Sequence, residues 1–101
     1  NGADGCQDLD PTKIRETAIN EPLINWHSID GDAALEAIRS SGGWAAYASD
    51  RGMAGYSRMI RASEGLNVLP ASTAGLIALL EGHRRQPLSN DRYVVVLTGR
   101  R

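Results

Sequence analysis

The sequence has almost no cysteine, no phenylalanine and no long apolar run. Its 101 residues include a single cysteine and no phenylalanine. That thiol, Cys6, has no partner for an internal disulfide, which is typical of a reducing compartment, and its Gly/Asp-rich surroundings indicate a passive thiol. No apolar stretch approaches the ~20 residues of a membrane span, and no basic segment followed by an apolar core opens the sequence. We therefore expect a cytoplasmic protein with no membrane partner.

An excess of charge of either sign is also missing. Eleven basic residues stand against twelve acidic ones, for a formal net charge of −1. A nucleic-acid-binding domain needs a basic face, so we expect no nucleic-acid partner. His27 and His83 are far apart and lack the Cys/His spacing of a zinc site, so we expect no metal. The basic residues are almost all arginines, with one lysine, Lys13.

Residues 30–42 show the apolar period of a helix. Asp30 or Asp32 is a suitable N-cap, and Gly42 stands where a left-handed C-cap belongs. A second helix is expected from about Arg51 to Glu64, capped by Ser49 or Asp50 and ended by Gly65. Its expected inner face is formed by Met53, Tyr56 and Ile60.

Pro70 opens a third expected helix, at a position that tolerates a missing N–H group. The apolar residues of this helix point to every side of its axis, which predicts burial nearly all round. These residues are Ala74, Leu76, Ile77, Ala78, Leu79 and Leu80. His83 and two arginines follow at its end, where cations interact favourably with the helix dipole.

Three short segments have strand character: residues 17–20, residues 44–49 and the β-branched run 93–99, "YVVVLTG"; over the six residues 44–49 the pattern is also compatible with a helix. A continuous apolar strand is typical of a parallel sheet covered on both faces. The alternation of helices and strands therefore predicts an α/β fold, a partial three-layer parallel-sheet domain with about three helices and two to three short strands. Residues 1–16 are a polar lead-in and are expected to be a loop, with one helical turn after Pro11.

A sheet of two or three short strands is too narrow to cover a helix that is apolar on every side. Some partner surface is therefore missing from these residues. We expect it to come from the remainder of a larger enzyme or from a second copy of the chain. A homodimer formed by pairing or exchange of the last strand would satisfy the second possibility.

Several motifs recur in the order that one enzyme family shows. They are "AALEAIRSSGGWAAYASDRGM", "RASEGLNVLPASTAGLIALLEG" and "YVVVLTG", preceded by "ETAINEPL". Together they resemble the C-terminal part of threonine synthase, and more broadly the tryptophan-synthase-β-like (fold type II) pyridoxal-phosphate enzymes. The resemblance covers residues 17–101, the expected C-terminal part of such an enzyme's large domain. It implies a lyase or synthase of amino-acid biosynthesis, acting by β-replacement or by β,γ-elimination and replacement.

The resemblance also implies a set of cofactor-binding residues. In the family the hydroxyl of a Thr-Gly or Ser-Gly turn meets the pyridine nitrogen of pyridoxal phosphate, which places Thr98 and Gly99 at the cofactor. The start of the third helix, at Ser72, would lie beside the same ring and support that turn. Read from the residues alone, Thr98 is an ordinary strand-ending threonine. Ser72 is a helix N-cap, the role we favour for it even with the resemblance.

Departures from the family pattern concern the catalytic groups. The family's cofactor-holding lysine, the Asn over the ring and the Gly-rich phosphate loop have no counterpart in residues 17–101, and Lys13 lies in the lead-in. Leu69 stands where the family usually has Glu, and Arg100 where it continues with glycine. We therefore expect no catalytic residue here and a segment that is inactive alone, its pyridoxal phosphate belonging to the parent enzyme. The alternatives are a stand-alone, non-catalytic α/β module for assembly or small-ligand binding, and a structural domain unrelated to this family.

Overall fold

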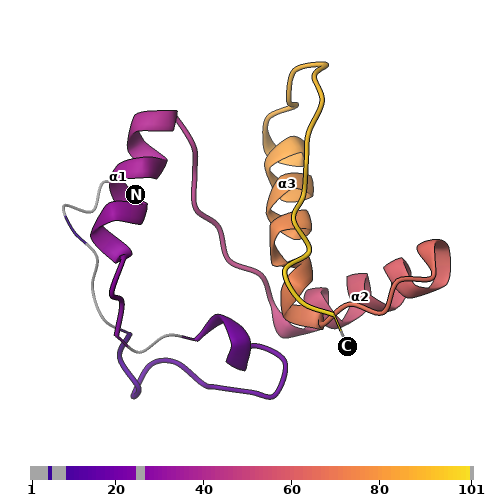
Figure 1. Ribbon diagram of the computed structural model, residues 1–101, viewed down its shortest axis with the longest axis horizontal. Helices are drawn as coiled ribbons and strands as arrows, with labels where there is room; N and C mark the ends of the chain where they lie inside the picture. Colours follow the sequence, from indigo (N-terminus) through magenta and orange to yellow (C-terminus); the bar gives the residue numbers. More distant parts are fainter. Residues whose placement is uncertain (1–4, 6–8, 25–26, 101) are drawn as a thin grey trace.

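The structure is a computed structural model that describes residues 5, 9–24 and 27–100. This part of the chain forms three α-helices, α1 (Gly31–Ser41), α2 (Asp50–Glu64) and α3 (Ala74–Arg85). Two single-turn 3-10 helices, η1 (Glu21–Leu23) and η2 (Pro70–Thr73), complete the regular structure. Helices α2 and α3 meet at η2 and form an L, and α1 lies apart from them beyond a long extended connection (Figure 1).

The expected α/β parallel-sheet fold is wrong. Across the described ranges no strand forms, and the only β pairing is an isolated antiparallel bridge between Val68 and Arg100. Residues 18–20 form a turn, and residues 44–49 and 93–99 run without regular pairing. The β-branched composition favours an extended backbone, but a strand is stable only beside a partner strand. These segments do not pair with one another, so no sheet arises.

The expected first helix is confirmed as α1. Gly42 follows it with φ 69°, the left-handed conformation that ends a helix and that glycine adopts without strain. Asp30 occupies the N-cap position, although its side chain caps no backbone group. None of the residues of α1 is buried, and α1 packs against no other helix of the described part. This helix therefore contributes little to the core.

The second helix is also confirmed. The Gly52 N–H donates a hydrogen bond to the Ser49 hydroxyl at 3.0 Å, which makes Ser49 the N-cap of α2. Gly65 ends α2 with φ 69°. Met53 and Ile60 are buried and Tyr56 is half-buried, so the predicted inner face of this helix does face the core.

The third helix begins one turn late and is less buried than expected. Pro70 starts the 3-10 turn η2, and α3 follows from Ala74. Ile77 is the buried residue of α3, whereas Leu80 is 41% exposed, so the expectation of burial on every side is wrong for the described chain. Too little of the chain packs around α3 to cover its apolar surface.

Two extended segments pack on one face of α3. A side-chain atom added at Gly75 would lie 3.8 Å from Val95, and one added at Gly82 would lie 3.1 Å from the Trp44 ring. Residues seven positions apart lie on the same side of a helix. The segments 44–49 and 93–99 therefore approach the same face of α3, one near each end.

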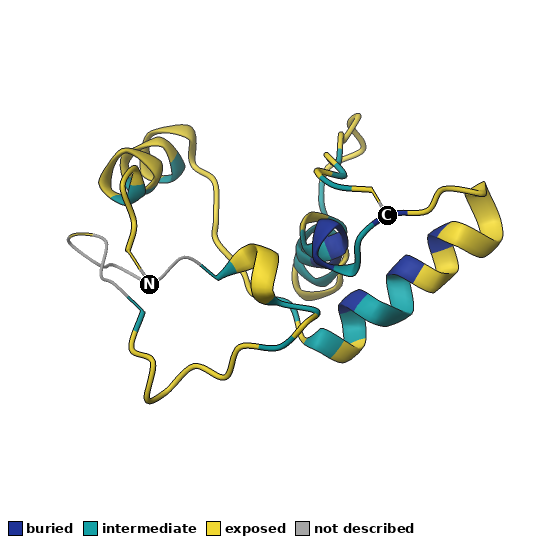
Figure 2. Cartoon of the chain, turned by 60° about the horizontal axis from the view of Figure 1, so that its bottom comes forward, coloured by how far each residue is buried: buried dark blue, intermediate teal, exposed yellow. Residues whose placement is uncertain are grey.

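The core is small and lies where the two long helices meet. Its buried members are Met53, Ala71 and Ile77. Partly buried apolar residues surround them, namely Ile19, Ala48, Tyr56 and Ala74. Figure 2 shows burial confined to one face of α2, to η2 and the adjoining end of α3, and to the end of the stretch that precedes η2, where Val68 is buried. Much of the remaining chain is exposed.

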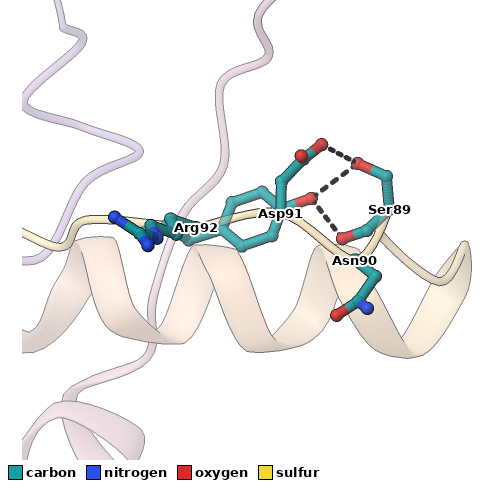
Figure 3. A pocket seen from close by; sticks show the side chains of 5 residues that line it. Ser89, Asn90, Asp91 and Arg92 are labelled. Carbon is teal, nitrogen blue, oxygen red and sulfur yellow. Dashed lines mark hydrogen bonds between the residues drawn. The ribbon is translucent and has the colours of Figure 1, made fainter.

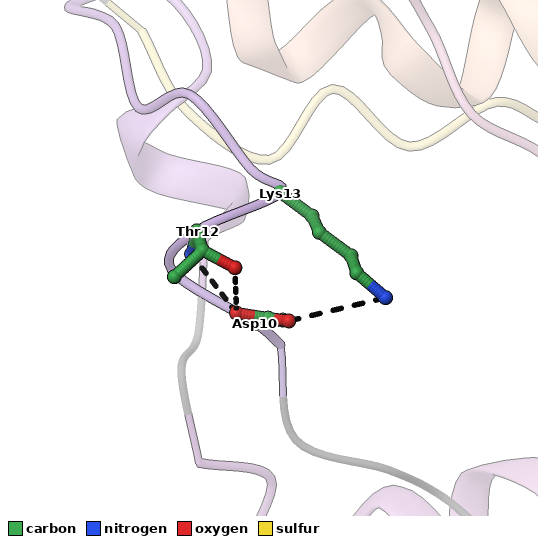
Figure 4. A network of polar contacts seen from close by, with 3 residues as sticks. All are labelled: Asp10, Thr12 and Lys13. Carbon is green, nitrogen blue, oxygen red and sulfur yellow. Dashed lines mark hydrogen bonds and ion pairs between the residues drawn. The ribbon is translucent and has the colours of Figure 1, made fainter.

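The lead-in contains an ordered turn after Asp10. The Asp10 carboxylate accepts hydrogen bonds from the Thr12 N–H at 2.9 Å and the Thr12 hydroxyl at 2.7 Å, and Lys13 lies 4.0 Å from it (Figure 4). The turn expected after Pro11 is thus present. Thr17 joins the segment after this turn to α2, because its hydroxyl donates to Asp50 at 2.6 Å.

Several large apolar side chains remain uncovered. Ile29 and Tyr47 are each 93% exposed, and Val94 and Val96 are 88% and 69% exposed. Isolated exposed apolar residues are common, but two valines on one side of a single segment form a continuous apolar stripe. None of the helices in the described residues is long and apolar enough to cross a bilayer.

Candidate functional site

The structure brings two of the three predicted cofactor-binding residues into contact. The Ser72 hydroxyl accepts a hydrogen bond from the Gly99 N–H at 2.6 Å and donates one to the Gly99 carbonyl oxygen at 2.9 Å. The Leu69 N–H donates to the same carbonyl at 3.1 Å. Ser72 therefore fastens the end of the chain to the entrance of α3, across 27 positions of sequence. We call Leu69, Ser72, Thr98 and Gly99 the terminal clamp.

The backbone before α3 places the Ser72 hydroxyl. Leu69 is extended because a residue before proline is restricted to that region, and Pro70 then begins the 3-10 turn. Ser72 and Thr73 are both buried in this turn. The Thr73 hydroxyl donates to the Pro70 carbonyl at 2.7 Å and lies 3.3 Å from the Met53 carbonyl, which holds the turn against α2.

Ser72 is not the helix N-cap that we favoured. The capping positions of η2 and α3 are Leu69 and Thr73, and neither makes a side-chain capping hydrogen bond. The hydroxyl of Ser72 is directed instead to Gly99. A local sequence rule assigned this serine to its own helix, whereas the folded chain uses it for a distant contact.

Gly99 occupies a place with no room for a side chain. A Cβ atom there would lie 2.8 Å from the Leu69 side chain and 3.1 Å from the Ser72 hydroxyl. The first separation is shorter than real Cβ contacts show and the second is tighter than most, so a larger residue would have to displace the end of the Leu69 side chain and crowd the Ser72 hydroxyl. Close backbone approach is therefore the reason for glycine at this position.

Thr98 stands on the open side of the final segment. Val95, Leu97 and Gly99 are partly buried, whereas Val94, Val96 and Thr98 are exposed. Burial thus alternates from one residue to the next, as it does in an extended chain that packs against the protein on one side only. The predicted burial of both faces of this segment is wrong within the described residues. Thr98 makes no hydrogen bond there, so its hydroxyl is available at the edge of the clamp.

A second buried serine, Ser57, holds the stretch before the clamp. Its hydroxyl donates to the Val68 carbonyl at 2.8 Å, and both residues are buried. Sequence reasoning missed Ser57, although its spacing from Met53 and Ile60 places it on the inner face of α2. The signal that could have revealed Ser57 is a small polar residue within the apolar face of a helix. No sequence signal identifies its hydrogen-bond partner, the backbone carbonyl of Val68, which lies eleven positions away.

Two hollows lie outside the clamp. The first is formed by the turn at residues 89–93 (Figure 3). The Ser89 hydroxyl donates to the Asp91 carboxylate at 2.6 Å, and the Tyr93 hydroxyl donates to the Ser89 carbonyl at 2.8 Å. The side chains of Ser89, Asp91 and Tyr93 thus bond to one another or to the backbone of the same turn, which is typical of a structural turn.

The second hollow is a groove of about 830 Å³ between residues 44–49 and the C-terminal half of α3. Trp44, Ile77 and Leu88 contribute apolar surface, and Arg85 contributes a charge. Glu81 also lines it and pairs with Arg84 on the next turn of α3. The hydrogen bond from Arg84 lowers the pKa of the Glu81 carboxyl group, and both side chains are solvent-accessible.

The groups that would support catalysis are not gathered at the clamp. Lys13 lies beside Asp10 with 80% of its side chain exposed. Among the described residues, no three His, Cys, Asp or Glu side chains are grouped as a metal site. His83 accepts a hydrogen bond from the Leu88 N–H at 3.0 Å, a local contact after α3. Cys6 lies outside the described residues.

Comparison of the chain with protein-family models, with curated proteins and with solved structures gave no match. The terminal clamp brings together Ser72 and Gly99, two residues that the motifs of the threonine-synthase resemblance assign to one site.

Proposed function

We propose that this chain is a segment of a threonine-synthase-like, pyridoxal-phosphate-dependent enzyme of cytoplasmic amino-acid metabolism. In this proposal the segment contributes the terminal clamp to the cofactor site and is not catalytic alone. The observation that supports it is the reciprocal hydrogen bonding of Ser72 and Gly99, which leaves the neighbouring Thr98 hydroxyl exposed. Motifs alone had assigned these three residues to one site.

In this proposal the clamp faces one side of the bound cofactor. Pyridoxal phosphate supplies an electron-accepting ring when bound. A threonine hydroxyl can donate a hydrogen bond to a ring nitrogen without transferring its proton, because its acidity is far too low. Ser72 and Leu69 fix the Gly99 backbone, and that in turn limits where the Thr98 hydroxyl can lie. The role proposed for Thr98 is thus to orient the ring.

The other half of such a site is not supplied by residues 17–101. They contain neither a lysine nor a Gly-rich phosphate-binding loop. The exposed stripe formed by Val94 and Val96 supports the same proposal, since these side chains would be covered by the rest of the enzyme. The described segment therefore contributes orientation, and other parts of the enzyme contribute covalent attachment and phosphate binding.

The test uses the enzyme that carries this segment together with its cofactor-binding lysine. Thr98→Ala removes one hydrogen bond, and we expect cofactor affinity to fall by roughly tenfold, equivalent to ~1.4 kcal/mol. Thr98→Ser keeps the hydroxyl and should lie close to the wild type. Met59→Ala, at a half-exposed position of α2, is the matched control and should change nothing. Equal cofactor affinity for the wild type and Thr98→Ala would remove Thr98 from the site.

A second candidate function is a stand-alone, non-catalytic module that binds a small ligand. The groove beside Trp44 favours it, because its volume of about 830 Å³ and mixed lining suit a drug-sized molecule. In that case an apolar ligand would perturb Trp44, and Gly82→Leu would block binding by displacing the Trp44 ring, which a Cβ atom at Gly82 already meets at 3.1 Å. Under the enzyme-segment proposal, Gly82→Leu and Thr98→Ala affect different ligands, so the two functions are distinguishable.

A further inference from the structure

One face of α3 forms a wall of the groove beside Trp44. Ala78, Gly82 and Arg85 recur at helical spacing on this face, and all three line the groove. The indole ring of Trp44 lies against the same face, because a Cβ atom at Gly82 would meet its Cζ2 at 3.1 Å and its Nε1 at 3.7 Å. Glycine therefore lets the N–H edge of the ring approach the helix, and Arg85 follows one turn further along.

The apolar part of the lining suits an aromatic body. Ile77 is buried and Leu88 is half-buried, and both line the groove together with Trp44. The Trp44 side chain is 55% exposed, so much of the indole ring is open to a ligand. Aromatic rings attract one another through offset stacking or edge-to-face contact, beyond the area that they bury. A planar aromatic ligand would gain more from this lining than an aliphatic one of equal size.

Several polar side chains of the lining already have partners. These are Ser49, Glu81 and Ser89, whose partners are Gly52, Arg84 and Asp91 respectively. Glu81 is the acidic residue of the groove, and the hydrogen bond from Arg84 offsets its charge. The acidic group of the lining is therefore engaged before any ligand enters.

Two hydrogen-bond donors of the lining have no partner. Within the described ranges of the chain, neither the guanidinium group of Arg85 nor the indole N–H of Trp44 makes a hydrogen bond or an ion pair. Both groups donate and cannot accept. Tyr47 and Gln86 can do either, so they favour neither sign of charge. The uncompensated charge of the groove is thus the positive charge of Arg85, which a carboxylate meets with two parallel hydrogen bonds.

We propose that the groove binds an aromatic carboxylate, with its ring beside Trp44 and its carboxylate on Arg85. This inference rests on the second candidate function, the ligand-binding module, and names the class of its ligand. It does not involve the terminal clamp, so it does not depend on the role proposed for Thr98.

The probes for the test are 2-naphthoate and its uncharged analogue 2-naphthamide, which share one ring system. Each is added to the 101-residue chain while the indole N–H resonance of Trp44, assigned with Trp26→Phe, is followed by NMR. We expect 2-naphthoate to bind with a dissociation constant of about 1 mM, the affinity that ~13 non-hydrogen atoms give at ordinary ligand efficiency. We expect 2-naphthamide to bind at least about tenfold more weakly, because it lacks the charge-assisted hydrogen bonds.

Arg85→Gln should lower the affinity for 2-naphthoate to that for 2-naphthamide. Arg58→Gln is the matched control, because it removes the same charge from an exposed position of α2 and should leave the affinity unchanged. Circular dichroism checks that the helices persist in both variants. Equal affinities of the wild type for the two probes, or unchanged binding of 2-naphthoate by Arg85→Gln, would overturn the inference while the ligand-binding candidate stands. If neither probe binds the wild type, the inference and that candidate function are both overturned.

Discussion

Ser72 and Gly99 share two hydrogen bonds through one hydroxyl group, which accepts from the Gly99 N–H and donates to the Gly99 carbonyl oxygen. This contact joins the start of α3 to the segment that ends at Gly99. Because Gly99 follows Thr98 directly, the contact also fixes the backbone position of Thr98. The stability of the clamp should therefore depend on this one oxygen.

Removal of the Ser72 hydroxyl should loosen the terminal clamp. In Ser72→Ala the partly buried Gly99 N–H loses its partner, at a cost of about 1–3 kcal/mol. We expect faster hydrogen exchange at the Gly99 amide and a lower midpoint of thermal unfolding. Ser63→Ala is the control, because the Ser63 hydroxyl bonds only to its own helix and is exposed. Unchanged exchange at Gly99 would show that Ser72 does not hold it.

Glycine-to-alanine changes should act in opposite directions at two positions. At Gly99 the added methyl group meets Leu69 at 2.8 Å, so we expect a loss of about 1–3 kcal/mol. At Gly55, inside α2, the nearest atom is 4.0 Å away, and alanine should add roughly 0.5–1 kcal/mol. Chemical denaturation measures both. A Gly99→Ala chain as stable as the wild type would contradict the close approach described here.

The buried Ser57 should matter more than its size suggests. Ser57→Ala leaves the Val68 carbonyl without its donor in a buried place, which costs about 1–3 kcal/mol. Ser40→Ala, at an exposed position of α1, serves as the control for the loss of a hydroxyl group. If both variants unfold at the same denaturant concentration, the Ser57–Val68 contact contributes nothing to stability.

The turn in the lead-in should depend on pH. The hydrogen bonds from the Thr12 hydroxyl and N–H lower the pKa of Asp10 below its ordinary value of 3.8. A depressed folded pKa means that the turn is fully stabilised above 3.8 and loses that contribution as the pH falls through the lower, folded value. Thr12→Val removes the hydroxyl, and carbon-detected NMR titration should then show the pKa of Asp10 moving back up. No movement would exclude the hydroxyl as the cause.

Local signals predicted the helices well. Gly42, Ser49 and Gly65 each occupy the helix-ending or helix-starting position that the sequence indicates. The reason is that caps act within one turn, so their energetics are contained in a few neighbouring residues. The clamp could be predicted only through motifs, because Ser72 and Gly99 are far apart in sequence and nothing local connects them.

Non-local pairing is where the sequence reasoning failed. The run from Tyr93 to Leu97 has the composition of a strand. Its backbone lies beside α3, but no other extended segment of the described chain pairs with it (Figure 1). Strand formation depends on a second segment at the right distance, which composition does not encode. Val94 and Val96 remain exposed because no such second segment covers them in the described chain.

The most direct test of the central claim, that the segment orients a cofactor but does not hold it covalently, is made on the chain itself. The chain is mixed with micromolar pyridoxal phosphate, reduced with borohydride and examined by mass spectrometry of its peptides. We predict no stoichiometric adduct on Lys13, since that side chain extends into solvent beside Asp10 and residues 17–101 supply no Gly-rich loop to hold the cofactor phosphate against it. A stoichiometric adduct on Lys13 that disappears in Lys13→Arg would contradict the account.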